Sequence, residues 1–216
     1  MDRRRIVSTG RVPTATVVLV LLATALTSAA EFWDTAPFTA WSEAQVQRIM
    51  TASPWSFTIV APLPPDAKGR PGPSRKAMLL SWRSALPVRQ AMVRSQAGSG
   101  GRLNARQQDL LRPAASYTIA VGNMPYPFQP GQVESFLKRK KKPPIAASRV
   151  STQKIPTGWE LWIEFPRTDP LTLDDGEVEF TFRAATFGAN IAFSRPLAFK
   201  RTFKLKRMTV GGRLEL

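Results

Sequence analysis

The chain has 216 residues, with 31 Lys and Arg against 15 Asp and Glu, a formal net charge of +16, and neither histidine nor cysteine. These absences exclude a Ser-His-Asp triad, a Cys-His pair, disulfides, a lipid-modified cysteine and any zinc or copper site that needs nitrogen or sulfur ligands. We therefore predict no catalytic residue, no metal ligand and no cofactor site. Only carboxylate, Lys, Tyr or Ser–Lys chemistry remains for a reaction.

Residues 1–30 have the three parts of a secretory signal peptide. Arg3, Arg4 and Arg5 give a positive start, an apolar run follows over 17–26, and small residues end the segment. The run is too short to span a hydrocarbon core, which takes about 20 apolar residues. We expect cleavage after Ala30, a periplasmic or secreted protein, and no transmembrane segment after cleavage. The arginines also fit a twin-arginine signal loosely, so the export route stays open.

Residues 31–216 are predicted to form one α+β domain, with a largely antiparallel sheet and about three helices mainly on one face. The domain begins with an aromatic arm, residues 31–41. We expect this arm to be extended and packed on the domain, because its Phe and Trp side chains are too apolar to stay in water. A Pro- and Gly-rich stretch, residues 61–75, is typical of an exposed loop.

Capping and chain-breaking residues predict the positions of helices. Ser42, with Gln45 three residues later, forms a capping box at the start of the first helix. Further helices are predicted over 88–96, 104–112 and 132–140. The basic sequence 138–142 would then have a structural role, because cations are favourable at a helix C-terminus.

Alternating apolar and polar residues predict strands in the C-terminal third. In the strand over 159–165, the odd positions face the core, and Glu160, Trp162 and Glu164 face outward. A later basic row, which ends at Lys206, would face outward in the same way. It would pair with the outward acidic residues of a neighbouring strand if the two are adjacent.

Basic side chains form a candidate surface for an anionic glycan or lipid, because a field of positive sign attracts anionic polymers and membrane surfaces. In an exported protein we expect such partners rather than nucleic acid. Trp162, between two Glu, either packs under a neighbouring segment or is exposed for stacking on a ligand. The basic candidates are Lys138, Arg139, Lys140, Lys141, Lys142, Lys200, Lys204 and Lys206.

Three patterns resemble reactive sites but lack the necessary context. Ser151 and Lys154 match S-x-x-K, but an Ile-Pro pair follows and opposes the required helix start, which predicts a loop. Glu160 and Glu164 would lie about 13 Å apart along one strand, beyond the spacing of paired glycosidase carboxylates. The acidic stretch 169–176 lacks the spacing of a calcium loop and is predicted to be a turn.

Several stretches resemble a family of uncharacterised exported proteins from acidobacteria. They include PFTAWSE within 32–55, WRSALPVRQA over 82–91, PLTLDDGEVEF within 165–180 and KLKRM within 204–216. The resemblance implies export and a single domain, and it supplies neither an activity nor catalytic residues.

We expect an exported, non-catalytic domain that binds a ligand or is associated with the cell envelope. One alternative is a basic surface that recognises an anionic glycan or lipid. The other is a histidine-free, carboxylate-dependent hydrolase, which a concave pocket lined by mutually close carboxylates would favour.

Overall fold

The computed structural model describes residues 31–62, 75–97, 102–124, 128–184 and 196–216. The chain divides into two units, 1–30 and Glu31–Leu216, and all described residues belong to the second. The predicted signal peptide and residues 63–74 of the predicted loop lie outside the described residues.

The predicted α+β class is confirmed, with mostly antiparallel sheets and four α-helices among the described residues. The predicted helices that begin after Ser42, near residue 88 and after Asn104 are all present. The helices are α1 (Phe32–Thr35), α2 (Glu43–Thr51), α3 (Leu86–Ala97) and α4 (Ala105–Leu110). Four 3-10 turns are η1 (Phe38–Ala40), η2 (Pro130–Gln132), η3 (Leu173–Asp175) and η4 (Leu205–Arg207).

Six strands form the larger sheet, in the order β1-β2-β3-β4-β8-β7, and every neighbouring pair is antiparallel. Its strands are β1 (Ala52–Ser53), β2 (Ser56–Pro62), β3 (Arg75–Trp82), β4 (Ser116–Met124), β7 (Arg149–Ile155) and β8 (Gly158–Pro166).

Four strands form the second sheet, in the order β10-β9-β5-β6, again antiparallel throughout. Its strands are β5 (Val133–Arg139), β6 (Lys142–Ala146), β9 (Glu177–Ala184) and β10 (Leu197–Lys204). A short hairpin of β11 (Thr209–Val210) and β12 (Arg213–Leu214) precedes the C-terminus.

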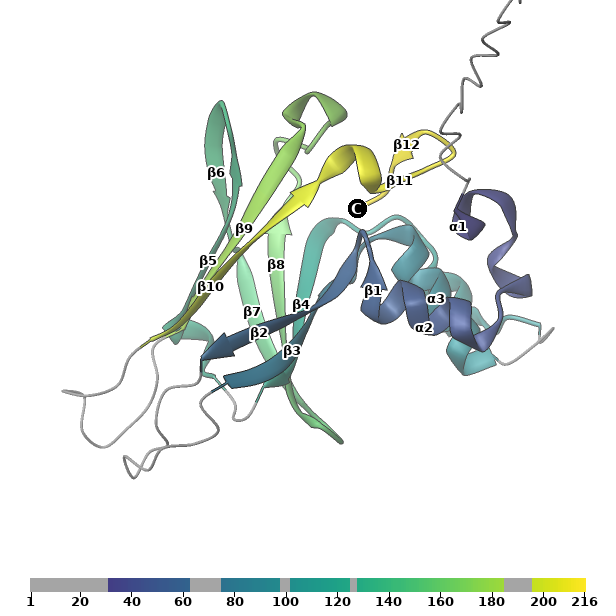
Figure 1. Cartoon of the computed structure of the whole chain (residues 1–216), viewed down its shortest axis with the longest axis horizontal. Helices are drawn as coiled ribbons and strands as arrows, with labels where there is room; N and C mark the ends of the chain where they lie inside the picture. The colour runs from purple at the N-terminus through teal and green to yellow at the C-terminus, as the bar shows by residue number, and fades with distance from the viewer. Residues whose placement is uncertain (1–30, 63–74, 98–101, 125–127, 185–195) are drawn as a thin grey trace, which may run out of the picture. The chain divides into compact units, whose positions relative to one another are not determined.

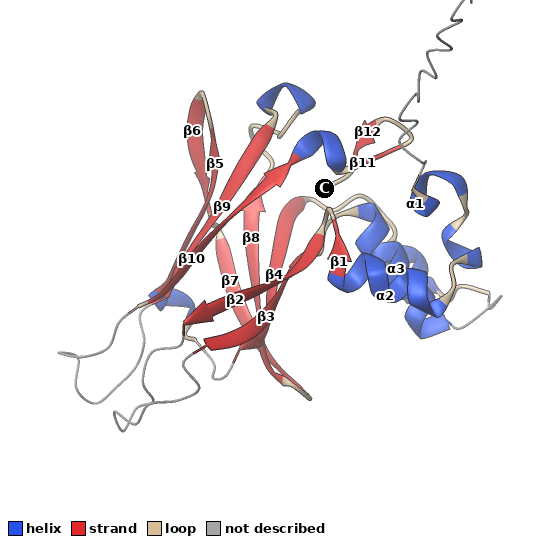
Figure 2. Ribbon diagram, in the orientation of Figure 1, coloured by secondary structure: helices blue, strands red, loops and turns tan. Residues whose placement is uncertain are grey.

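The core lies between the two sheets. Phe203 of β10 contacts Phe57 of β2 and Trp82 of β3, with ring centroids 5.2 and 4.9 Å apart, and Phe165 of β8 lies 6.3 Å from Phe180 of β9. Figures 1 and 2 show the four-stranded sheet on one side of the six-stranded sheet and α2 and α3 on the other. Along the strands that face this core, every second side chain points inward, as the alternation of apolar and polar residues in the sequence predicts.

The predicted helix over 132–140 is wrong, because these residues form strand β5. Ser135, Leu137 and Arg139 are buried at alternate positions, and β5 pairs with β9 and β6. The segment has polar residues and a basic end that suit a helix terminus, but pairing between two strands decides its conformation. The basic sequence 138–142 consequently spans a hairpin.

The N-terminal arm packs on the domain as predicted, but it is not extended. It turns through α1 and η1, and the indole N–H of Trp41 donates to the carbonyl of Ala36 at 3.1 Å. These turns bury both Trp33 and Trp41. Burial of two large aromatic side chains favours the compact path over an extended one.

The capping box before α2 is present as predicted. The Ser42 hydroxyl accepts a hydrogen bond from the Gln45 backbone N–H at 3.2 Å, and the Gln45 side chain accepts from the Ser42 N–H at 2.8 Å. Asn104 and Gln107 repeat this arrangement at α4. Both helices are therefore closed at their N-termini by residues that the sequence identifies.

The C-terminal segment is tied to the N-terminal one. The backbone N–H of Gly211, at the tip of the β11–β12 hairpin, donates to Asp34 at 2.9 Å, and the indole N–H of Trp55 donates to the carbonyl of Glu215 at 2.7 Å. These contacts hold the β11–β12 hairpin against α1 and the C-terminal residues against the start of β2.

Candidate functional site

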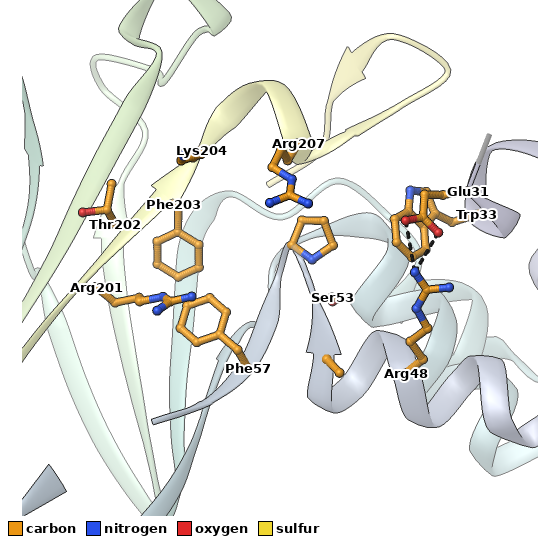
Figure 3. Close-up of a pocket in the computed structure, with 12 residues that line it drawn as sticks. Glu31, Trp33, Arg48, Ser53, Phe57, Arg201, Thr202, Phe203, Lys204 and Arg207 are labelled. Carbon is orange, nitrogen blue, oxygen red and sulfur yellow. Dashed lines mark hydrogen bonds and ion pairs between the residues drawn. The ribbon is translucent and has the colours of Figure 1, made fainter. Parts of the chain in front are cut away.

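A pocket of about 330 Å³ lies where the N-terminal arm, the start of β2 and the end of β10 meet (Figure 3). It opens between β2 and β10, which are not hydrogen-bonded to each other and belong to different sheets. Its lining residues are Glu31, Trp33, Arg48, Ala52, Ser53, Pro54, Phe57, Arg201, Thr202, Phe203, Lys204 and Arg207.

Aromatic side chains contribute an apolar surface to this pocket. Phe57 of β2 and Phe203 of β10 contact each other across the seam between the sheets, and Trp33 of the arm forms part of the opposite wall. Trp33 also packs edge to face on the buried Trp55, with centroids 5.4 Å apart. The aromatic surface is therefore held by contacts to the core.

The charged groups around the pocket are mainly basic. Arg48 forms an ion pair of 2.8 Å with Glu31, the one acidic side chain in the lining. Arg201 lies over the Phe57 ring, 4.0 Å from its centroid (Figure 3). Among the described residues, Arg201, Lys204 and Arg207 form no ion pair, and all three are exposed. An anionic group would be attracted to this part of the pocket.

The alternation of β10 explains how a cation enters an apolar row. Phe199, Arg201 and Phe203 share one parity along the strand and turn toward the six-stranded sheet. Arg201 occurs at the opening of the pocket, where its guanidinium carbon lies over the Phe57 ring and the side chain stays exposed. The sequence does contain a signal for this residue, because an Arg occurs at an inward position of an alternating strand. The sequence-based prediction did not identify Arg201.

Most of the predicted basic surface lies elsewhere. Among the eight candidates, only Lys204 lines this pocket. Lys138, Lys140 and Lys141 are exposed in the β5–β6 hairpin region, and Lys206 is exposed in η4 rather than on a strand. The other basic residues that line the pocket are Arg48, Arg201 and Arg207, which were not predicted from the sequence.

Two of the basic candidates have structural roles. The Arg139 side chain is buried, where it pairs with Asp169 at 2.8 Å and donates to the carbonyl of Pro143 at 3.0 Å. Lys142 pairs with Asp175 at 3.1 Å. These contacts tie the hairpin to residues 169–175, so the Arg139 guanidinium is buried and paired within the fold, and Lys142, although exposed, is also paired. The acidic stretch 169–176 contains the predicted turn.

The electrostatics of Asp175 fit this structural role. Burial raises the pKa of Asp175, whereas the Thr172 backbone N–H and the Lys142 ammonium lower it by more, so the pKa lies below its ordinary range. Among the described residues, no group of three or more acidic side chains could hold a metal ion.

The outer face of the four-stranded sheet carries both signs of charge. Lys200 pairs with Glu179 at 3.8 Å, and Lys138 lies directly across from Glu179 on the other side of β9. The predicted pairing of the acidic and basic outward rows is therefore present at Lys200. Neighbouring charges of opposite sign reduce the attraction of this face for an anion.

Glu160 and Trp162 lie on the outer face of the six-stranded sheet, but Glu160 is buried, contrary to its predicted exposure. Arg83 pairs with Glu160 at 2.5 Å, and Gln153 and Trp162 donate to the same carboxylate at 2.8 and 2.9 Å. Trp162 is half-buried. Ser151, predicted to be in a loop, lies in β7. The S-x-x-K pattern thus lies on a strand rather than at a helix start.

Comparison of the chain with protein-family models, with curated proteins and with solved structures finds no match. No helix within the described ranges is both long and apolar enough to cross a membrane. The pocket between β2 and β10 is therefore the main basis for a functional assignment.

Proposed function

We propose that this chain is an exported, non-catalytic domain that binds an anionic ligand in the pocket between β2 and β10. The observation that carries the proposal is the group of three basic side chains, Arg201, Lys204 and Arg207, beside the aromatic pair Phe57 and Phe203. The cations would contact a phosphate or carboxylate group, and the half-buried Phe57 ring, supported from behind by the buried Phe203, would contact the apolar part of the same ligand.

Export is supported by the signal-peptide pattern of residues 1–30 and by the resemblance to exported acidobacterial proteins. In a periplasmic or extracellular setting, the available anionic ligands include phospholipid headgroups and acidic polysaccharides. N-terminal sequencing of the secreted protein should begin at Glu31. Recovery of the intact chain with Met1 as the sole form would contradict export.

The pocket supports binding better than carboxylate-dependent hydrolysis. Its one acidic side chain, Glu31, is already paired with Arg48. A hydrolase of that type uses two carboxylates placed about 5–9.5 Å apart around the bond to be broken. The pocket offers no such pair among the described residues.

The binding proposal is tested by two triple variants that remove the same charge. Arg201→Ala, Lys204→Ala and Arg207→Ala alter the pocket, whereas Lys138→Ala, Lys140→Ala and Lys200→Ala alter the mixed-charge outer face of the four-stranded sheet and its β5–β6 hairpin. Binding is measured by calorimetry to polygalacturonate and by sedimentation with phosphatidylglycerol vesicles, each over a range of salt concentrations. The two probes distinguish a polysaccharide from a lipid source.

We expect the pocket variant to bind one of these probes about tenfold or more weakly and with a shallower salt dependence, because fewer counterions are released. The surface variant should bind much as the parent does. Equal losses in both variants would show that affinity follows net charge alone, and no binding of either probe by the parent would also contradict the proposal.

A further inference from the structure

A second pocket, of about 400 Å³, lies on the opposite side of the six-stranded sheet from the four-stranded one. It is formed by α3, the end of α4 with the residues that follow it, and the outer face of β4 and β8. Met92, Leu110 and Pro113 supply apolar surface on the helical side, and Thr118 and Trp162 belong to the sheet side. Arg83, just after β3, lines the same pocket.

Trp162 is held in one orientation. Its indole N–H donates to Glu160 at 2.9 Å, and Glu160 is fixed in turn by Arg83 and Gln153. Directly across from Trp162 on the two neighbouring strands are Ala120 and Ser151. Because both neighbours are small and Trp162 is half-buried, part of its indole surface remains available to the pocket.

Arg83 has hydrogen-bonding capacity left over. Its Nη2 donates to Glu160, whereas its buried Nε finds no acceptor in the described part of the chain. The guanidinium carbon lies 5.9 Å from the centroid of the Trp162 ring. Because the Nε is buried, a ligand oxygen in the pocket would have to accept from the other N–H groups of the Arg83 guanidinium.

The charges of this pocket are largely satisfied within the protein, unlike those of the first pocket. Glu160 neutralises Arg83, and Asp109 pairs with Arg112 at 3.5 Å. Arg89 donates to the backbone carbonyls of Ser84, Leu110 and Arg112. A ligand here therefore needs hydroxyl or carbonyl oxygens and a flat apolar face more than it needs a net charge.

We propose that this second pocket is a site for a neutral saccharide, with Trp162 as the stacking surface. One face of a pyranose ring presents C–H bonds, whose partial positive charge is attracted to the negative face of an indole ring. The ring hydroxyls can accept from guanidinium N–H groups of Arg83 other than its buried Nε. This inference does not depend on the anionic ligand of the first pocket.

The test uses tri-N-acetylchitotriose and maltotriose as uncharged probes, with affinity from calorimetry and ring contacts from saturation-transfer NMR. We expect one of them to bind the parent protein. Trp162→Ala should weaken that binding about tenfold or more, which is the usual effect of removing a stacking aromatic side chain. Trp162→Phe keeps a flat ring and should retain most of the affinity.

Phe136→Ala is the matched control, because Phe136 is also half-buried and faces outward, but on the other sheet. It should leave saccharide binding unchanged. If Trp162→Ala does not fold, Thr118→Phe fills the pocket while keeping Trp162 and should weaken binding as strongly. The proposal is overturned if the parent protein binds neither trisaccharide. It is also overturned if a folded Trp162→Ala or Thr118→Phe variant keeps the parent's affinity, or if Phe136→Ala loses as much affinity as the pocket variant.

Discussion

Arg83 and Glu160 form an ion pair of 2.5 Å on the outer face of a sheet, with side-chain exposures of only 11% and 7%. Gln153 and Trp162 complete the hydrogen bonding of the same carboxylate. A buried charge is tolerated when a partner and hydrogen bonds replace its hydration. The cluster joins the end of β3, β7 and β8, so it fixes the sheet surface beneath the second pocket.

Glu160→Gln should destabilise the fold strongly, because it leaves the Arg83 charge buried without its counter-ion. We expect a loss of about 3–5 kcal/mol in the free energy of unfolding at pH 7, measured in urea. Glu164→Gln is the matched control on the same strand face. Glu164 is more exposed and lies 4.0 Å from Arg149, so its loss should be about 1 kcal/mol or less. Equal effects would show that the buried Arg83–Glu160 pair stabilises the fold no more than the exposed Arg149–Glu164 pair.

The same pair predicts a dependence on pH. Burial raises the pKa of Glu160, whereas the Arg83 charge and the three donors lower it by more, so the folded-state pKa lies below the ordinary value. The stabilisation is thus fully present above the unfolded pKa of about 4.3 and is lost as pH falls through the folded pKa. The stability gap between parent and Glu160→Gln should therefore be constant from neutral pH to about 5 and should narrow in more acidic solution.

Gly158→Ala should destabilise the β7–β8 hairpin. Gly158 has φ of +139°, and a Cβ at this position would clash with the backbone oxygen of Met124, which cannot rotate away. The strained backbone alone costs about 1–3 kcal/mol, and the contact adds to it. Gly131→Ala is the control, because a Cβ there meets nothing within 4 Å. Thermal melting should show a clear decrease for the first variant and little change for the second.

The sequence predicted elements whose signals are local. The Ser42 capping box, the start of α4 at Asn104 and the inward row of β8 all depend on residues close together in the chain. The error at β5 has the opposite origin. Its conformation depends on pairing with β9, whose residues are roughly forty to fifty positions away. Local propensity does not report such pairing.

The candidate site was predictable only in part for the same reason. Lys204 was identified from its charge, but the partners of Arg139 and Lys142 lie in a separate segment, and only the fold shows that those cations are occupied. Arg201 was not identified from the sequence, and its contact with Phe57 joins residues of two different sheets. Glu160 was expected to be exposed because Arg83, which covers it, is 77 positions earlier in the chain.

Two buried tryptophans allow the tie between the C-terminal tail and the first strands to be measured. Trp55 and Trp82 are both 0% exposed, but Trp55 donates its indole N–H to Glu215 whereas that of Trp82 has no acceptor among the described residues. Substitution by Phe removes similar volume at both sites. Trp55→Phe also leaves a backbone carbonyl without its donor, so it should cost about 1–2 kcal/mol more than Trp82→Phe in urea unfolding. Hydrogen exchange should be faster at Glu215, whose N–H donates to Met208, in the Trp55 variant only. A larger loss in Trp82→Phe would mean that packing of the indole, rather than its hydrogen bond, holds this end of the chain.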